Sequence, residues 1–269
     1  MGAGARGVEP GVAVVTGGAS GIGRAIAARL VRGAHRVVLT DRDEAAARRT
    51  AAQLGARAGL RLDVRDPQAH HDVAAAAGEL GRVRAWFNNA GVAPDGDLAA
   101  LSDAQVREVV EVNLLGALWG TRAAFQAFGS QGGDVVITSS LFGLGPAPGL
   151  SAYAATQAAL ISLATSVHGE TPPGVRIHAL CPDGVDTEML EAMNPAGAGH
   201  ALLHSGRGLL TPEEVARVAV GLLGSRRVVR SLPAWRGAMV RGSGLVPGPA
   251  TRALPRVVGR GRRAAARAD

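Results

Sequence analysis

The sequence predicts an α/β fold, a Rossmann-like doubly wound parallel sheet flanked by helices and formed by a single domain. Short apolar, β-branched runs alternate with longer segments of helical period, which is the pattern of βαβ units around a parallel sheet. A glycine-rich turn joins the first run to the first helical segment. The length of 269 residues is sufficient for one large domain with a buried core.

The expected elements follow one another with recognisable ends. Apolar runs predict strands at residues 12–16, 36–40, 59–63, 83–88, 134–138 and 175–180. The first helix carries Ile22, Ile26 and Leu30 on one face and ends near Gly33. Periodicity predicts further helices at residues 43–54, 67–80, 102–128 (with a break) and 152–169. Capping boxes that begin at Ser102 and Thr211 mark two helix starts.

Composition excludes several chemistries. All 29 basic residues are arginine, so a Schiff-base lysine and a lysine-dependent Walker phosphate loop are ruled out. Tyr153 is the only tyrosine, and Cys181 is the only cysteine, which excludes an internal disulfide and a cysteine metal cluster. No apolar run reaches the roughly 18 residues of a membrane span, and the start lacks a signal-peptide pattern. We therefore expect a cytoplasmic protein.

The net charge of +7 is concentrated near one end of the chain. Residues 1–225 contain 18 arginines and 21 acidic residues, whereas residues 226–269 contain 11 arginines and only Asp269. Apolar and basic side chains alternate in this tail, as in Trp235, Arg236, Met239, Arg241 and Leu245. Two interpretations stay open: a solvated or oligomer-packing tail, or peripheral contact with an anionic membrane. We expect no nucleic-acid binding, because no recognition motif accompanies the charge.

The glycine-rich turn has the spacing of a dinucleotide-binding site. Gly17 allows a sharp turn, Gly21 lets the backbone approach a pyrophosphate, and Gly23 lets the helix pack closely on the strand. Free N–H groups at the helix start, around Ser20 and Ile22, then face the anion. The position between a strand and a helix favours this function over a purely structural turn.

Asp41 ends the second predicted strand, 18 residues after Gly23. A carboxylate there accepts hydrogen bonds from both adenosine ribose hydroxyls and repels a 2′-phosphate, which favours NAD over NADP. Arg42 leaves NADP as an alternative, because its guanidinium can contact a 2′-phosphate. Two other interpretations of Arg42 stay open: it stacks on adenine, or it is a solvated residue at the helix entry.

Together with further motifs, these residues give a chain that resembles the short-chain dehydrogenase/reductase family in its common form, from about residue 10 to about residue 220. Asp63-Val64 is similar to the pair that meets adenine, and Asn88-Asn89-Ala90-Gly91 matches the motif after the fourth strand. The resemblance implies a cofactor-binding set made of Gly17, Ser20, Gly21, Ile22, Gly23, Asp41, Arg42, Asp63, Val64, Asn89, Ala90, Gly91, Tyr153, Gln157, Pro182, Val185 and Thr187.

The resemblance also implies a catalytic set of Asn113, Ser140, Tyr153 and Gln157. Ser140, 13 residues before Tyr153, would hydrogen-bond the substrate oxygen. Tyr153 would pass a proton to or from that oxygen while hydride moves to or from the nicotinamide. Asn113 would hold a water molecule in a proton relay. The residues alone leave simpler interpretations open. Ser140 is then a loop hydroxyl whose hydrogen bonds are made within the protein, and Asn113 is a buried polar bridge.

Gln157 departs from the family pattern Tyr-x-x-x-Lys. It lies one helical turn after Tyr153, on the same face. The family's lysine binds the nicotinamide ribose and lowers the tyrosine pKa, whereas glutamine donates hydrogen bonds but supplies no charge. A free tyrosine titrates near pH 10, so we predict that Tyr153 is neutral at pH 7. A neutral phenol is a usable acid and a poor base, which predicts slow turnover that favours carbonyl reduction.

The segment after the sixth strand resembles the family's Pro-Gly-x-Val-x-Thr sequence and begins at Pro182. The resemblance implies that the backbone of Val185 and the side chain of Thr187 contact the nicotinamide carboxamide. Asp183 replaces the first glycine. A solvent-facing turn residue is the favoured interpretation, and a carboxylate that points into the site as an extra acid or base is the alternative.

The substrate site is expected to form from residues 92–95, 141–152 and 189–210. Its apolar side chains predict a hydrophobic carbonyl or alcohol substrate: Phe142, Leu144, Leu150, Met189, Leu190, Leu202 and Leu203. His200 and His204 are spaced to share a helix face. A useful metal site needs a third ligand, so we expect a mobile lid with incidental histidines and no metal.

These observations predict three segments. Residues 1–9 form a flexible N-terminus, residues 10–245 form the NAD-binding Rossmann-type domain with a substrate lid at about 187–210, and residues 246–269 form a disordered Arg-rich tail. The predicted function is NAD(P)(H)-dependent oxidoreduction of a hydrophobic carbonyl or alcohol. The alternative is a cyclase, dehydratase or isomerase on this fold, or a cofactor-binding protein without catalysis. The resemblance implies a homodimer or homotetramer through residues 102–128 and 152–169.

Overall fold

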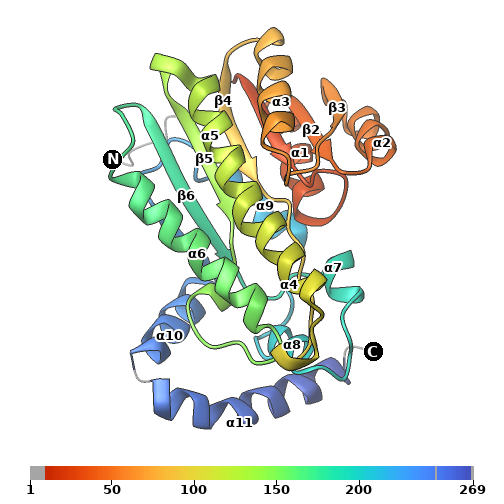
Figure 1. The fold of residues 1–269 in the computed structure, drawn as a ribbon, viewed down its shortest axis with the longest axis vertical. Coiled ribbons are helices and arrows are strands. Elements are labelled where there is room, and N and C mark those ends of the chain that lie inside the picture. The colour runs from red at the N-terminus through yellow and green to blue at the C-terminus, as the bar shows by residue number, and fades with distance from the viewer. Residues whose placement is uncertain (1–9, 246, 268–269) are drawn as a thin grey trace, which may run out of the picture.

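A computed structural model describes residues 10–245 and 247–267, so the N-terminus predicted to be flexible lies outside the described residues. Seven parallel strands form one sheet in the order β3-β2-β1-β4-β5-β6-β7, which is the predicted Rossmann-like architecture (Figure 1). The strands are β1 (Val12–Thr16), β2 (Arg36–Asp41), β3 (Ala58–Arg61), β4 (Val83–Asn88), β5 (Gly133–Thr138), β6 (Val175–Pro182) and β7 (Val229–Leu232).

Helices cover both faces of the sheet. In Figure 1 the front face carries α3 (Pro67–Glu79), α5 (Gly116–Phe128) and α6 (Ser151–His168). The other face carries α1 (Gly21–Arg32), α2 (Glu44–Leu54) and α9 (Pro212–Val220). Along β4, Trp86 packs into one buried cluster and Phe87 into the other, because successive strand side chains alternate. Burial on both faces explains why the strands read as continuous apolar runs.

The strand order reverses at β1, which lies between β2 and β4. Connections that leave the carboxyl ends of these two strands diverge and open a crevice, the usual ligand position in such sheets. The glycine turn follows β1, and Asn89 follows β4. Ser139 follows β5 and Asp183 follows β6. The sheet therefore brings these four predicted segments to one edge.

The long helix expected at residues 102–128 is interrupted. It consists of α4 (Asp103–Val109), a π-helical segment (Val110–Leu115) and α5. Both predicted capping boxes are present, at Ser102 and at Thr211. Asn113 lies in the π-helical segment, a local geometry that often accompanies functional sites.

The lid region contains two short helices, α7 (Glu188–Glu191) and α8 (Ala198–Leu203). After β7 the chain continues as α10 (Ala234–Gly244) and α11 (Pro247–Ala265). The prediction of a disordered tail is wrong for the described part of residues 246–269. Helix α11 packs on α8 so closely that a Cβ on Gly261 would lie 1.7 Å from the Ala201 carbonyl oxygen. This packing outweighs the unfavourable Gly and Pro content.

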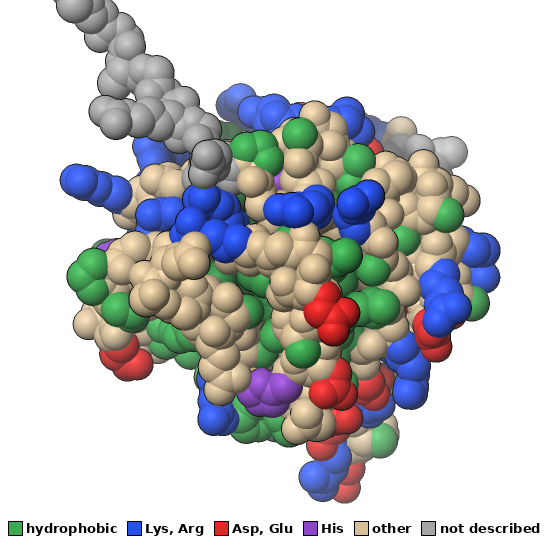
Figure 2. Space-filling model, turned by 90° about the horizontal axis from the view of Figure 1, so that it is seen from above, with side chains coloured by type: hydrophobic (Ala, Val, Ile, Leu, Met, Phe, Trp, Pro, Cys, Tyr) green, Lys and Arg blue, Asp and Glu red, His purple; other side chains and the backbone are tan. Residues whose placement is uncertain are grey.

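Helix α11 lies at the lower end of the molecule in Figure 1. Figure 2 shows the molecule from above, where arginine side chains gather across the upper part of the view and acidic side chains lie mainly in the lower part. No helix in residues 10–245 and 247–267 is both long and apolar enough to cross a membrane.

Candidate functional site

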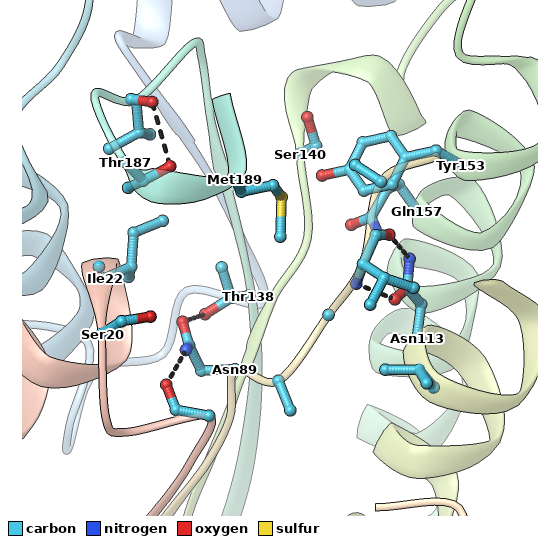
Figure 3. A pocket seen from close by; sticks show the side chains of 18 of the residues that line it. Ser20, Ile22, Asn89, Asn113, Thr138, Ser140, Tyr153, Gln157, Thr187 and Met189 are labelled. Atoms are coloured by element: carbon cyan, nitrogen blue, oxygen red, sulfur yellow. Dashed lines mark hydrogen bonds between the residues drawn. The ribbon is translucent and has the colours of Figure 1, made fainter. Parts of the chain in front are cut away.

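A cavity of about 410 Å³ runs along the carboxyl edge of the sheet, from the glycine turn to α6 and the lid (Figure 3). Every residue of the predicted cofactor-binding and catalytic sets lines it except Gly23. Gly23 lies behind the turn, where a Cβ would lie 2.0 Å from the Gly17 carbonyl oxygen. Three apolar residues expected to meet the substrate, Phe142, Leu144 and Leu202, are not in the lining.

The glycine turn leaves room and donors for a ligand. Gly17 and Gly21 have φ angles of 61° and 47°, a region that favours glycine. A Cβ on Gly17 would lie 2.8 Å from the Cα of Ala90. Ser20 precedes α1 without a side-chain cap hydrogen bond, so its side chain occupies none of the N–H groups of the first turn. Such a helix start fits the pyrophosphate of a dinucleotide.

Asn89 fastens the turn to the middle of the sheet. The backbone N–H groups of Asn89 and Ala90 donate to Thr16 Oγ1 at 3.0 and 3.1 Å. Asn89 Nδ2 donates to the Thr16 and Gly17 carbonyl oxygens, each at 3.3 Å. Thr138 Oγ1 donates to Asn89 Oδ1 at 3.0 Å, a bond drawn in Figure 3. The motif after β4 therefore fixes the shape of the turn.

Two acidic residues lie at the end of the cavity predicted to hold adenosine. The Asp41 carboxylate accepts the N–H groups of Ala19 and Asp43, both at 3.3 Å, and this holds it at the rim beside the glycine turn. Asp63 pairs with Arg65 at 2.5 Å, and that hydrogen bond lowers the pKa of Asp63. Arg65 also lines the cavity, which we did not predict, although its charge two residues after Asp63 was a usable signal.

Ser140 and Tyr153 form the chemical centre of the cavity. In Figure 3 the Tyr153 hydroxyl is directed toward the Ser140 side chain. Ser140 Oγ accepts the N–H of Phe142 at 3.2 Å, which orients the serine at the end of β5. Burial raises the pKa of Tyr153 to about 12, although a hydrogen bond with Ser140 acts in the opposite direction. Tyr153 is therefore a neutral phenol at physiological pH.

Gln157 lies one turn further along α6 and is 3% exposed. Its Oε1 atom is buried and has no hydrogen-bond partner among the described residues. A buried acceptor without a donor is costly in free energy, so the arrangement fits a ligand hydroxyl. The cavity at this point thus matches the ribose of a nicotinamide cofactor, and Gln157 contributes no positive charge there.

The side chain of Asn113 is a buried bridge. Its Oδ1 accepts the N–H of Val92 at 2.8 Å, and its Nδ2 donates to the Val92 carbonyl at 2.9 Å and to Thr156 Oγ1 at 3.2 Å. Thr156 in turn donates to the Tyr153 carbonyl at 2.7 Å. The amide therefore links the loop after β4 to the tyrosine helix. The water relay implied for Asn113 stays a prediction.

Asp183 is not a solvent-facing turn residue, so that interpretation is wrong. It is 8% exposed and pairs with Arg236 Nε from α10 at 2.8 Å. Burial raises the pKa of Asp183, and the Arg236 charge acts against this. Sequence alone gave no signal for the pair, because the two residues are far apart and Arg236 lies in the segment that composition assigned to a basic tail.

The other end of the cavity is apolar. Leu150, Met189, Leu190 and Leu203 line it as predicted, together with Met193. The rings of His200 and His204 lie 4.3 Å apart at α8. In residues 10–245 and 247–267, no three His, Cys, Asp or Glu side chains come together in a metal-binding group.

Comparison with known proteins agrees with this geometry. The family model described as short chain dehydrogenase matches residues 11–197. A 1-deoxy-11-beta-hydroxypentalenate dehydrogenase of Streptomyces arenae is 37% identical over 80% of this chain and 79% of its own length. A 3-oxoacyl-(acyl-carrier-protein) reductase of Salmonella typhimurium is 30% identical over 80% of this chain and 89% of its own.

Solved structures give the same result. A short chain dehydrogenase/reductase from Burkholderia phymatum in complex with NAD superposes with a TM-score of 0.78 at 30% identity, covering 87% of this chain and 92% of that chain. An alcohol dehydrogenase from Thermococcus sibiricus complexed with 5-hydroxy-NADP gives 0.69 at 28% identity, covering 83% of this chain and 95% of that one.

Proposed function

Because the chain belongs to the short-chain dehydrogenase/reductase family and is an NAD(P)-dependent oxidoreductase, we propose that it reduces a hydrophobic carbonyl compound with NADH as the favoured cofactor. One observation carries this proposal. Ser140 and Tyr153 are neighbours in the lining of the cavity, and the Tyr153 hydroxyl is directed toward the Ser140 side chain (Figure 3). A carbonyl oxygen placed between them has a hydrogen-bond donor and an acid within reach.

The residues present fit a dinucleotide. The glycine turn and the start of α1 would hold the pyrophosphate, and the Asp41 carboxylate would hold the adenosine ribose. Gln157 Oε1 would accept a hydroxyl of the nicotinamide ribose. When bound, the cofactor supplies the hydride for the carbonyl carbon. Asp41 supports NAD over NADP, because a carboxylate at the ribose repels a 2′-phosphate.

The direction of the reaction follows from the proton that Tyr153 holds. Ser140 would orient the carbonyl oxygen, and Tyr153 would give it a proton as negative charge develops there. With a pKa of about 12, only on the order of 1 in 100,000 Tyr153 side chains is ionised at pH 7. The acid form needed for reduction is therefore abundant, and the base form needed for alcohol oxidation is scarce.

Leu150, Met193 and Leu203 support a hydrophobic substrate. The test is a titration of purified protein with NADH and NADPH, followed by assay of a series of ketones of increasing hydrophobicity. We expect tighter NADH binding, and kcat/KM that increases with ketone hydrophobicity. Tyr153→Phe should abolish turnover and keep NADH binding. Binding of neither cofactor, or equal rates for polar and apolar ketones, would contradict the proposal.

We propose a homo-oligomer through residues 102–128 and α6. Apolar side chains of the first of these segments support it: Val110 of the π-helical segment is 39% exposed, and Leu115 of the same segment and Leu118 and Trp119 of α5 are half-buried in the single chain. Light scattering of the protein and of Leu118→Arg tests this. We expect an oligomer for the first and a lower mass for the second.

A second partner proposal concerns the outer face of α11. Its exposed arginines follow one another at helical spacing (Arg252, Arg256, Arg260 and Arg263) and point away from α8. This arrangement supports contact with an anionic membrane surface.

A further inference from the structure

Asp183 lines the cavity and forms a buried ion pair with Arg236 behind it, although no proton step of the proposed reaction uses the pair. Both side chains are less than one-tenth exposed, at 4% and 7%. Burying two charges is costly unless the geometry is good and further hydrogen bonds satisfy the groups. An apolar pair of similar volume would often give equal or better stability. The pair therefore suggests a role in fixing the relative position of neighbouring segments.

The segments that the ion pair connects include the lid. Arg236 Nη2 donates to Ser205 Oγ at 2.7 Å and to the Leu202 carbonyl at 3.4 Å. Ser205 Oγ itself donates to the Leu202 carbonyl at 2.6 Å, which closes the end of α8. Arg236 thus joins the end of β6, where Asp183 lies, to the lid and to α10.

Close packing at Gly206 shows how little space the pair leaves. A Cβ on Gly206 would lie 2.9 Å from Arg236 Nη1 and 3.0 Å from Asp183 Oδ2. The backbone of the lid therefore rests directly on the ion pair. A shift of either charged side chain would move the lid backbone with it.

Helix α11 holds the lid from the other side. Besides the contact of Gly261 with Ala201, Arg262 Nη2 donates to the Ala196 carbonyl at 3.3 Å. Val258 packs on the apolar cluster that includes Leu202 and Leu203. Leu203 of α8 lines the cavity. The contacts of α11 with α8 therefore help to hold one wall of the cavity in place.

We propose that Asp183 and Arg236 are positioning residues that hold residues 198–209 as a fixed wall of the substrate end of the cavity. The substrate is then selected by a preformed apolar surface, and the expected mobile lid is replaced by an anchored one. The kinetic consequence rests on the proposed function, whereas the structural consequence does not. Neither residue needs to touch the substrate.

The structural test is hydrogen–deuterium exchange of the full chain, without ligand. Arg236→Met should raise the exchange of residues 198–205 at least about tenfold, because the anchor to Ser205 is lost. Arg176→Met is the matched control, since it breaks another ion pair, Arg176–Asp134 at 2.7 Å, at the opposite end of β6. The control should leave residues 198–205 protected.

A double variant separates positioning from general stability. Asp183→Asn combined with Arg236→Met leaves no unpaired buried charge, so its Tm should recover relative to Arg236→Met. The lid anchor is still missing, so residues 198–205 should still exchange fast. If protection of these residues returns together with the Tm, the pair has only a structural role and the proposal is overturned.

Kinetics give the second readout. For a hydrophobic ketone, Arg236→Met should raise KM at least about tenfold and change kcat much less, because ground-state and transition-state contacts with the wall are lost together. The NADH Kd should stay within about twofold of wild type, since Arg236 itself is not among the residues that line the cavity. Unchanged KM with normal NADH binding would overturn the positioning role. Absence of NADH binding in wild type would instead overturn the proposed function and leave the exchange result valid.

Discussion

At the scale of a single residue, Gln157 gives the sharpest test of the proposed chemistry. We predict that Gln157→Lys speeds alcohol oxidation at pH 7, because an ammonium one helical turn from Tyr153 favours the phenolate. With the Tyr153 pKa at about 12, wild-type oxidation should rise about tenfold per pH unit up to the highest pH at which the fold survives. The lysine variant should reach the same rate at least one unit lower. The measurement is kcat/KM for oxidation across pH 6 to pH 11.

Gln157→Met is the matched control for that experiment. It removes the orphaned Oε1 acceptor without adding charge, so cofactor binding should weaken while the slope of the pH profile stays unchanged. Fast oxidation by wild type at pH 7, with no gain in the lysine variant, would show that Tyr153 is ionised by another route.

Individual site residues were predictable where a motif fixes their spacing. Gly17 follows β1, Asp41 ends β2, Ser140 lies two residues after β5, and Tyr153 lies in the first turn of α6, and all four line the cavity. Asp183 was misjudged for a physical reason. Its environment is set by Arg236, and no local pattern connects a turn after β6 with a helix beyond β7.

At the scale of the elements, the position of α11 depends on its close contact with α8 at Gly261 more than on the helix propensity of its own sequence. We predict that Gly261→Ala detaches α11 from α8, because the added Cβ would meet the Ala201 carbonyl oxygen of the backbone, which cannot move cheaply. Limited trypsin digestion measures this, since α11 contains exposed arginines that a docked helix protects from cleavage. Cleavage within residues 247–267 should become much faster.

Gly259→Ala in the same helix serves as the control. A Cβ there meets only Arg263 Nη1 at 3.7 Å, and alanine favours the helix by about 1 kcal/mol over glycine. Trypsin resistance of α11 should hold or increase. Equal cleavage of the two variants would mean that the close approach of α11 and α8 does not hold the helix in place.

The elements of the sheet were predictable because helices bury both faces, so each central strand appears as an apolar run. The short edge strand β7 was missed, since its four residues are only half-buried. Helix α11 was missed because its composition opposes a helix, and the contacts that stabilise it come from α8. Local sequence patterns therefore predict the central strands, whereas tertiary packing determines whether segments such as β7 and α11 form at all.

At the scale of the whole molecule, the candidate active-site cavity and the concentrated positive charge of α11 lie in different places. The cavity lies at the carboxyl edge of the strands, and the basic stripe of α11 lies on the outside of the lid helix. The observed strand order explains why the cavity lies at this edge. The sequence pattern did not predict that the basic tail covers the lid, because the tail follows the last strand and has no fixed place in the sheet pattern.

The basic stripe gives the last prediction, which concerns binding of the whole protein to vesicles. Arg252, Arg256, Arg260 and Arg263 lie on the face of α11 opposite to Leu254 and Val258, and each arginine contributes about 1 kcal/mol at an anionic surface. We expect co-sedimentation with phosphatidylserine-containing vesicles that weakens as salt is raised, and none with neutral vesicles. Replacing the four arginines by glutamine should abolish it.

The control removes the same charge elsewhere. Glutamine at four exposed arginines on and near α1 and α2 lowers the net charge equally and should leave vesicle binding intact: Arg32, Arg48, Arg49 and Arg57. Equal loss in both variants would mean that total charge, and not the α11 face, attracts the protein to the membrane. A change in oligomeric mass confined to the α11 variant would instead assign the stripe to a contact between copies of the chain.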